Sequence, residues 1–210
     1  MTNPSDFVMQ MAIVLGSITV HEFAHAKSAD MAGDMTPRLY GRVTLNPTRH
    51  FEPMGLFMIF FSSLAGFGFG WGKPVPIDPR KMRSPRWDSV LVTAWGPFSN
   101  LLIALGAAVL LRLAPTLTAQ GIAGNFLLLT IVINLTLAFF NLIPLFPLDG
   151  SWILQGLLPE RFGFQLSQWN RRYGAMVLLT CLLVLPLVGL PVIEWVLMPP
   201  VMQAFRILVG

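Results

Sequence analysis

The sequence predicts an all-α polytopic membrane protein, folded as a single domain over residues 1–210, with about four to six transmembrane helices. Hydrophobic residues make up 54% of the chain and charged residues only 11%, whereas a soluble globular domain carries about a quarter charged residues. Several long stretches also lack Asp, Glu, Lys and Arg altogether. Because a helix needs roughly 20 mostly apolar residues to cross a bilayer, these stretches are candidate membrane spans.

The uncharged stretches decide how many spans to expect, and they cover residues 7–20, 53–72, 89–111, 120–148 and 173–193. The last three are each long enough to cross a bilayer as a helix. The first is long enough only if its helix continues through His21, Glu22 and His25. No basic residue precedes it and no small-residue cleavage pattern follows it, so we expect it to remain in the protein rather than be removed as a signal peptide.

The second stretch, residues 53–72, is long enough to span but has the wrong composition for one regular helix. It ends in Gly-Phe-Gly-Phe-Gly-Trp-Gly, and each glycine disfavours a helix by roughly 0.8–1 kcal/mol relative to alanine. We therefore expect a re-entrant or interfacial segment here. Short extended (β) pieces are expected within residues 38–88, because residues 41–46 alternate at a period of two and the prolines of residues 73–77 favour an extended backbone.

Two further elements lie near the C-terminus. Residues 150–158 predict a short helix that ends at Pro159, within an otherwise polar section. The tail from residue 195 to residue 210 is apolar and is interrupted by Pro199 and Pro200. The sequence leaves open whether this tail lies in the membrane interface or packs on the helical bundle.

The net charge of +4 reflects basic residues in loops beside apolar stretches, so it indicates membrane orientation and not nucleic-acid binding. Residues 26–89 hold nine Lys and Arg residues, whereas residues 1–6 hold none. Cytoplasmic loops of membrane proteins carry an excess of Lys and Arg. The first helix is therefore expected to run from the outside to the cytoplasm of a multi-pass cell-membrane protein.

The sharpest chemical feature is His21-Glu22-Phe-Ala-His25 at the end of the first apolar stretch. Residues four apart lie on one face of a helix, so the two imidazoles are placed to bind one Zn²⁺ ion. Glu22 lies beside that face and is placed to act on the water at such an ion. Ionisable residues inside a membrane indicate a functional site by default, although a helix that ended at Val20 would put them among the lipid headgroups.

A catalytic zinc of this kind needs a third protein ligand and one open position. His50 is the only other histidine, and most acidic residues lie in loops beside basic ones. Asp149 differs, because it follows a long uncharged stretch that Pro144 and Pro147 interrupt. Such breaks at membrane depth are tolerated where protein or a water-filled cavity surrounds the backbone. The segment therefore predicts one wall of an active site, with a simple helix cap as the alternative interpretation of Asp149.

Together these motifs resemble the site-2 protease family of intramembrane zinc metalloproteases. The similar segments are residues 21–25, 41–47, 50, 71–76, 96–100 (Gly-Pro-Phe-Ser-Asn) and 141–150 (Asn-Leu-Ile-Pro-Leu-Phe-Pro-Leu-Asp-Gly). Residues 21–25 and 141–150 are similar to the two metal-binding motifs of the family, and residues 96–100 to its middle-helix motif. The remaining segments are similar to its short, single-domain bacterial branch, so the resemblance covers nearly the whole chain.

The resemblance implies one zinc ion per chain, held by His21, His25 and Asp149, with Glu22 as the general base. It implies hydrolysis of peptide bonds within or near transmembrane segments of membrane proteins, that is, regulated intramembrane proteolysis in a lipid bilayer. We expect no PDZ or CBS domain, which some relatives carry, within these 210 residues. The substrate, the trigger and the oligomeric state are not indicated.

A shared zinc ion also constrains the topology. If His25 and Asp149 meet, the chain makes zero or two crossings between residues 26 and 88. The loops on either side of residues 53–72 are then expected on the cytoplasmic side, together with the active site.

Two asparagines and one rival function complete the expectations. Asn100 or Asn141 is expected to bind substrate or help stabilise the oxyanion, and an interhelical hydrogen bond is the equal alternative for each. A metal transporter is the rival interpretation, since broken helices and buried ionisable residues also mark transporters. Glu22 argues against it, because a transport site has no special need for a base beside the metal.

Overall fold

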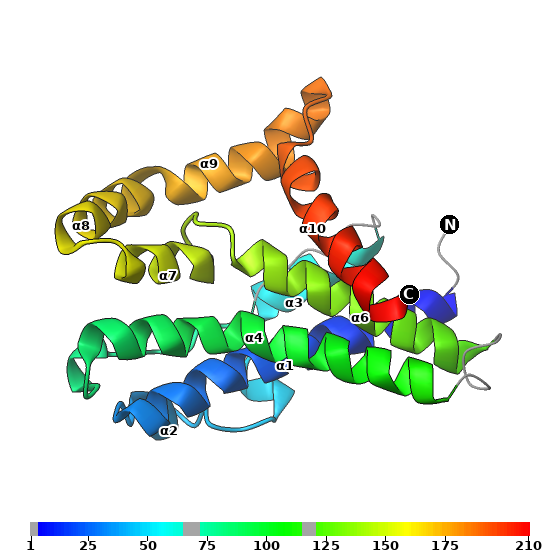
Figure 1. The fold of residues 1–210 in the computed structure, drawn as a ribbon, viewed down its shortest axis with the longest axis horizontal. Coiled ribbons are helices and arrows are strands. Elements are labelled where there is room, and N and C mark those ends of the chain that lie inside the picture. Colours follow the sequence, from blue (N-terminus) through cyan, green and yellow to red (C-terminus); the bar gives the residue numbers. More distant parts are fainter. Residues whose placement is uncertain (1–3, 65–71, 115–120) are drawn as a thin grey trace.

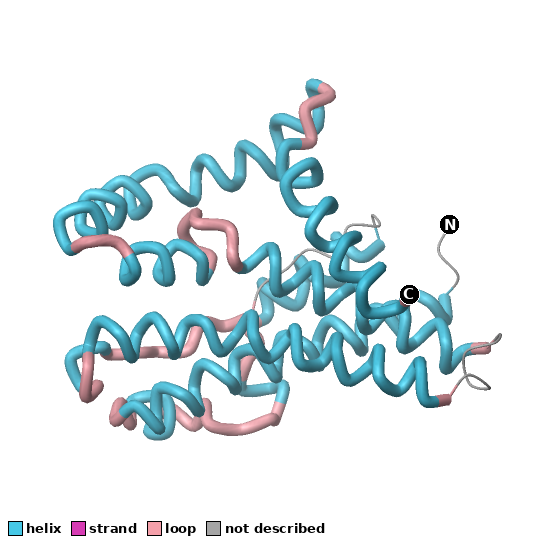
Figure 2. Tube along the Cα trace, viewed as in Figure 1, coloured by secondary structure: helices cyan, strands magenta, loops and turns pink. Residues whose placement is uncertain are grey.

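The computed structural model describes residues 4–64, 72–114 and 121–210, and its regular elements are helices (Figure 1). Five of the described helices are long and apolar enough to cross a membrane: Asp6–Ala32, Pro85–Leu113, Ile122–Asn141, Glu160–Val188 and Val192–Val209. This number lies within the range that the sequence predicts. The described residues contain no β-strand (Figure 2).

Three helices form the centre of the bundle: α1 (Pro4–Ala32), α4 (Pro85–Leu113) and α6 (Ile122–Asn141), which pack along one another (Figure 1). Among the described residues, the largest hydrophobic cluster packs alanines of α4 against α6 and α10 (Val192–Val209). It consists of Ala104, Ala107, Ala108, Ile131, Leu135, Leu197 and Val201. Small residues at a helix interface let two backbones approach closely, which favours association in a membrane. This packing fixes α4 against its neighbours.

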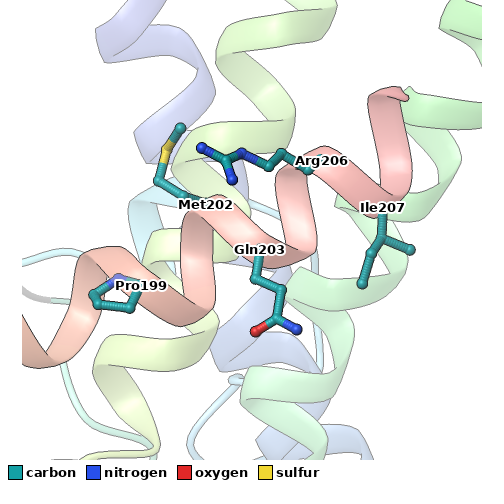
Figure 3. A pocket seen from close by; sticks show the side chains of 5 residues that line it. All are labelled: Pro199, Met202, Gln203, Arg206 and Ile207. Atoms are coloured by element: carbon teal, nitrogen blue, oxygen red, sulfur yellow. The ribbon is translucent and has the colours of Figure 1, made fainter.

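The C-terminal tail, whose place the sequence leaves open, is a helix that packs on the bundle. α10 contains Pro199 and Pro200, and its far end is tied to α4 by a hydrogen bond from Arg112 Nη2 to Ile207 O at 3.0 Å. A surface hollow is lined by Pro199, Met202, Gln203, Arg206 and Ile207 (Figure 3). All five residues come from α10, so the hollow involves none of the metal-binding candidates.

The helical structure is interrupted between α6 and α7 (Asp149–Leu157), as Pro144 and Pro147 predict. α7 occupies nearly the residues expected for a short helix, 150–158. Asn170, fully buried, closes this break: it accepts from Phe146 N at 3.0 Å and donates to Pro144 O at 3.2 Å. These bonds satisfy main-chain groups that the broken helix leaves unpaired. The next candidate span contains α8 (Glu160–Trp169), a π-helical turn (Asn170–Gly174), α9 (Ala175–Leu179), a second π-helical turn (Thr180–Val184) and a 3₁₀ turn (Leu185–Val188).

The predicted β pieces within residues 38–88 are wrong, because no strand forms in the described part of this region. The chain instead forms α2 (Thr36–Leu39) and two 3₁₀ turns, η1 (Pro47–Arg49) and η2 (Pro79–Lys81), with Gly41 at a φ of +65°. A strand needs a ladder of partners. Among the described residues no main-chain hydrogen bond joins residues 41–46 to residues 73–77, and Lys73 N donates instead to His50 O at 2.6 Å.

The two polar loops meet at one end of the bundle, as expected for zero or two crossings between them. Asp34 Oδ2 accepts a hydrogen bond from Asp78 N at 2.7 Å, and Arg83 N donates to Ala32 O at 3.1 Å. Between the loops, α3 (Pro53–Leu64) has 12 residues, or a length of about 18 Å. It is too short to cross a hydrocarbon core of about 30 Å. The glycine-rich tract at residues 65–71 lies outside the described residues.

Cysteine labelling is expected to find both loops on one side of the membrane, and their basic residues predict the cytoplasmic side. In a Cys181→Ser background, single cysteines replace Thr48 and Arg83, which are exposed in the two loops. A membrane-impermeant thiol reagent added to intact cells should reach neither cysteine, and should reach both once the membrane is opened. Labelling of one cysteine without the other in intact cells would mean that residues 53–72 cross once.

Candidate metal centre

Three side chains that are able to bind a metal ion converge from α1 and α7. His21 and His25 lie one turn apart on α1, and Asp149 is the first residue of α7. His21 Nε2 lies 3.1 Å from His25 Nε2 and 3.1 Å from Asp149 Oδ2, and His25 Nε2 lies 3.4 Å from Asp149 Oδ1. Within the described part of the chain, these three residues form the group able to share a metal ion. Both histidines are buried, whereas Asp149 is partly accessible.

The break between α6 and α7 brings Asp149 to the histidines. Because α6 ends at Asn141, the chain turns through residues 142–148 before α7 begins. Gly150 lets this turn close, since a methyl group at this position would overlap Leu142 O and lie 2.6 Å from Ile143 O. Asp149 therefore lies at the N-terminus of a helix, where a negative charge is favoured.

The other ring nitrogens of both histidines are engaged by α4, which fixes the direction of each imidazole. His25 Nδ1 lies 2.9 Å from Val92 O, and His21 Nδ1 lies 2.7 Å from Asn100 Oδ1. A carbonyl oxygen can only accept a hydrogen bond, so each Nδ1 donates and each Nε2 is left available. Both Nε2 atoms then face Asp149, as the ligands of one metal ion require.

The separations of the donor atoms fit a zinc ion. Tetrahedral zinc with bonds of about 2.0–2.1 Å places neighbouring donor atoms about 3.3 Å apart. The two Nε2 atoms lie 3.1 Å apart, and each lies 3.1 or 3.4 Å from its nearer Asp149 oxygen, Oδ2 for His21 and Oδ1 for His25. With one ligand atom taken from each residue, all three atoms lie within 4.8 Å of one another. In the described structure Asp149 Oδ2 is buried and makes no hydrogen bond, although it lies 3.1 Å from His21 Nε2. The two atoms are thus at contact distance without hydrogen-bond geometry, which suits ligands of one ion. Three protein ligands leave a fourth position open, as in catalytic zinc sites.

The carboxyl group of Asp149 is ionised. Burial raises the pKa of the Asp149 carboxyl group, but the neighbouring imidazoles of His25 and His21 lower it further, so the pKa lies below its usual range. Asp149 is therefore a carboxylate, which is the form that ligates a metal ion.

α4 comes close to the two imidazoles because Gly96 has no side chain. A methyl group at this position would overlap His25 Nε2 and would lie 2.7 Å from His21 Nε2. The next residue, Pro97, is buried inside the same helix. Gly96, which the sequence indicates only as part of a motif, therefore provides the space that the histidines occupy.

Glu22 lies next to His21 on α1 and is partly buried. Its carboxylate lies near Gly72, where a methyl group would be 3.2 Å from Glu22 Oε1 and 2.9 Å from Ile18 Cγ2. The loop that precedes α4 thus forms a wall beside the candidate base.

A chain of buried amides connects α1, α4 and α6 behind His21. Asn100 Nδ2 donates to Asn134 Oδ1 at 2.9 Å, and Asn134 Nδ2 donates to Thr130 O at 2.9 Å. Asn100 thus uses both ends of its amide in interhelical hydrogen bonds, the second of the two roles expected for it. Sequence reasoning missed Asn134, although an amide within an uncharged apolar stretch is a signal for such a bond.

Two other candidate residues lie outside this network. Asn141 is partly buried at the end of α6, and its Nδ2 donates to Leu137 O at 2.9 Å within the same helix. His50 is fully buried in the loop, where its Nε2 lies 2.7 Å from Thr44 O. The structure therefore brings together His21, His25 and Asp149 without His50.

Loss of the Asn100 amide is expected to weaken zinc binding. In Asn100→Ala, His21 Nδ1 loses its acceptor, so the imidazole is free to rotate and to change tautomer. Loss of such an outer partner typically costs ~10–100-fold in metal affinity. Competition with a chromogenic chelator measures the change, and Ser99→Ala serves as the control because the Ser99 hydroxyl donates to Gly96 O within α4. Equal zinc affinity in Asn100→Ala and wild type would contradict this role.

The sequence matches a known peptidase family and several named proteins. A family model described as Peptidase family M50 matches residues 114–185, a part that contains Asp149 but neither histidine. The chain is also similar to "Putative zinc metalloprotease YwhC" of Bacillus subtilis, with 39% identity over 177 residues that cover 81% of this chain and 78% of that protein. The second match therefore reaches beyond the residues of the family model.

Two actinobacterial proteins, each named "Putative zinc metalloprotease Rip2", are more distant. The protein of Mycolicibacterium smegmatis is 31% identical over 182 residues, covering 83% of this chain and 68% of that protein. The protein of Mycobacterium tuberculosis is 36% identical over 160 residues, covering 73% of this chain and 59% of that protein. No solved structure matches the chain significantly.

Proposed function

This chain belongs to peptidase family M50 and is a zinc metalloprotease, and we propose that it cleaves peptide bonds within or near the transmembrane segments of other membrane proteins, in regulated intramembrane proteolysis. One observation carries the proposal. His21 and His25 belong to a helix that is itself a candidate membrane span, and α4, which packs against them, is a second candidate span. This supports a substrate peptide bond that reaches these residues at membrane depth.

We assign the metal ligands to His21, His25 and Asp149 and the general base to Glu22. When bound, zinc polarises the scissile carbonyl and lowers the pKa of water, which makes water a nucleophile near neutral pH. Glu22 accepts the proton of the attacking water and then delivers it to the leaving amine. The partly buried position of Glu22 on α1, beside His21, suits both transfers.

The remaining polar residues of the site receive different roles. Val92 O and Asn100 are positioning groups, because they hold the imidazoles and do not reach the reacting atoms. Asn141 stays the candidate for a hydrogen bond to the substrate or the oxyanion, since it lies at the end of α6 just before the turn that leads to Asp149. A helical substrate must unwind first, because its carbonyl groups are otherwise hydrogen-bonded within its own helix.

The orientation follows from charge. The loops at the end of the bundle where residues 26–52 and 72–84 meet hold most of the basic residues of the chain. We therefore propose a cell-membrane protein whose active site is closer to the cytoplasmic side.

The function is tested by reconstituting the purified chain in liposomes with a model substrate that has one transmembrane segment. We expect cleavage that stops when a zinc chelator is added and returns when zinc is restored. A soluble peptide with the cleaved sequence should be a poor substrate, since it does not reach the site through the membrane.

The same liposomes distinguish the rival function. Zinc uptake into the liposomes without cleavage of any substrate would favour a transporter and contradict the proposal. Cleavage of the soluble peptide at the rate of the membrane substrate would keep the protease but remove its intramembrane specificity.

A further inference from the structure

A buried arginine in the loop after α2 has no role in the site described so far. Arg42 is only 6% exposed. Its guanidinium donates to three main-chain carbonyls: Arg49 O, Lys73 O at 3.3 Å and Pro74 O at 3.4 Å. Burial of a charged group is costly unless it is hydrogen-bonded, and these carbonyls offset that cost for Arg42.

The three carbonyls come from two segments that are far apart in the sequence. Arg49 lies in the first loop, and Lys73 and Pro74 lie in the second. Lys73 N also donates to His50 O at 2.6 Å, so both the N–H and the carbonyl of Lys73 are bonded to the first loop. We call this set of hydrogen bonds, from Arg42 to Arg49 O, Lys73 O and Pro74 O and from Lys73 N to His50 O, the Arg42 joint. The planar guanidinium holds several donors in a fixed geometry, which suits it to fix two segments in one register.

The joint lies directly beside the candidate base. Gly72, the residue before Lys73, is the position where a methyl group would lie 3.2 Å from Glu22 Oε1. The other end of the second loop is anchored as well, because Asp78 N donates to Asp34 Oδ2 at 2.7 Å. Arg42 thus holds the main chain next to Gly72. The main chain at Gly72 in turn limits the space that is open to the Glu22 carboxylate.

We propose that Arg42 is a positioning residue for Glu22: it holds the main chain of residues 72–74 against α1, so that the Glu22 carboxylate keeps one orientation. This inference rests on the proposed function, because it assigns Glu22 the role of the base. It assigns Arg42 no contact with substrate or metal. A misplacement of a reacting group by about 1 Å can cost on the order of 10²-fold in rate, so loss of the joint should act on the chemical step.

The first test replaces Arg42 by glutamine and by lysine. For Arg42→Gln, cleavage of the membrane substrate in liposomes should fall ~10–100-fold in kcat, with an unchanged KM and one zinc per chain. Arg42→Lys should behave in the same way, because a lysine keeps the charge but loses the planar set of donors. The control is Arg38→Gln, since Arg38 is an exposed arginine that pairs with Asp30 at 2.6 Å, and it should match wild type.

A second readout follows the main chain without any substrate. Hydrogen exchange of the peptide that contains residues 72–78 should be faster in Arg42→Gln, while exchange of α4 stays as in wild type. Restored activity in Arg42→Lys, or wild-type activity in Arg42→Gln, would overturn the inference. Loss of zinc together with general loss of structure would show that Arg42 is only structural and would also overturn it.

Gly72→Ala provides a variant in which the Arg42 joint remains intact. Its methyl group would lie 2.9 Å from Ile18 Cγ2 and 3.2 Å from Glu22 Oε1, so the Ile18 side chain and the Glu22 carboxylate should both shift. We expect kcat to fall while zinc stays bound, and wild-type kcat in this variant would contradict the inference. A failure of the proposed function looks different. In that case the wild-type protein and Arg38→Gln would hold zinc yet cleave no substrate, and both proposals would then be removed together.

Discussion

Glu22→Gln is expected to retain one zinc ion per chain and to lose at least ~10²-fold in the rate of cleavage, which is typical of a lost general base. Glutamine has the size and polarity of glutamate but cannot accept a proton at neutral pH. The three donor atoms of His21, His25 and Asp149 are not changed by this substitution. Elemental analysis of the purified variant measures zinc, and the liposome assay measures cleavage.

Glu160→Gln is the matched control for this experiment. Glu160 is exposed at the first turn of α8, so the same chemical change there should leave both zinc and cleavage at the wild-type level. Cleavage near the wild-type rate in Glu22→Gln would show that Glu22 is not the base. Loss of zinc from Glu22→Gln would instead indicate that Glu22 supports the ligand set, and the fall in activity would have another cause.

The pair His21 and His25 shows what local sequence can predict. A spacing of four residues places two side chains on one face of a helix whatever surrounds that helix, so the sequence alone brings these two together. Asp149 is far from the histidines in the sequence, and it is predicted as a third ligand from the prolines that end a helix at membrane depth. The structure places Asp149 3.1 Å from His21, a distance that depends on the turn at residues 142–148 and on the close contact at Gly150.

The contacts that shape the site are tertiary, and no local pattern predicts them. Val92 supplies a carbonyl, which every residue has, and the apolar stretch around Asn134 signals an interhelical hydrogen bond without naming Asn100 as its partner. The prediction of a strand at residues 41–46 is wrong for the same reason, because a strand also depends on tertiary contacts. Period-two alternation predicts a strand only if a partner is present, and here the chain turns so that the Arg42 side chain holds the second loop.

Two glycines of α4 have very different surroundings, although both are single glycines in the same apolar helix. Gly96 and Gly106 lie in the same helix. A methyl group at Gly106 would meet nothing within 4 Å, whereas a methyl group at Gly96 would overlap His25 Nε2 and lie 2.7 Å from His21 Nε2. Alanine is favoured over glycine in a helix by roughly 0.8–1 kcal/mol. The same substitution is therefore expected to be harmless or stabilising at one position and damaging at the other.

Gly96→Ala should lose most of its zinc and its cleavage activity, because the imidazoles or the whole of α4 must move to make room. Overpacking of a well-packed interior typically costs about 1–3 kcal/mol, so the bundle itself should still form, and its helix content by circular dichroism should match wild type. Gly106→Ala should keep one zinc per chain and full activity. His21→Ala and Asp149→Ala, measured beside them by elemental analysis, set the level expected for a lost ligand. If Gly96→Ala holds a full zinc ion and cleaves at the wild-type rate, the close approach of α4 does not shape the metal centre, and the ligand geometry described above must be revised.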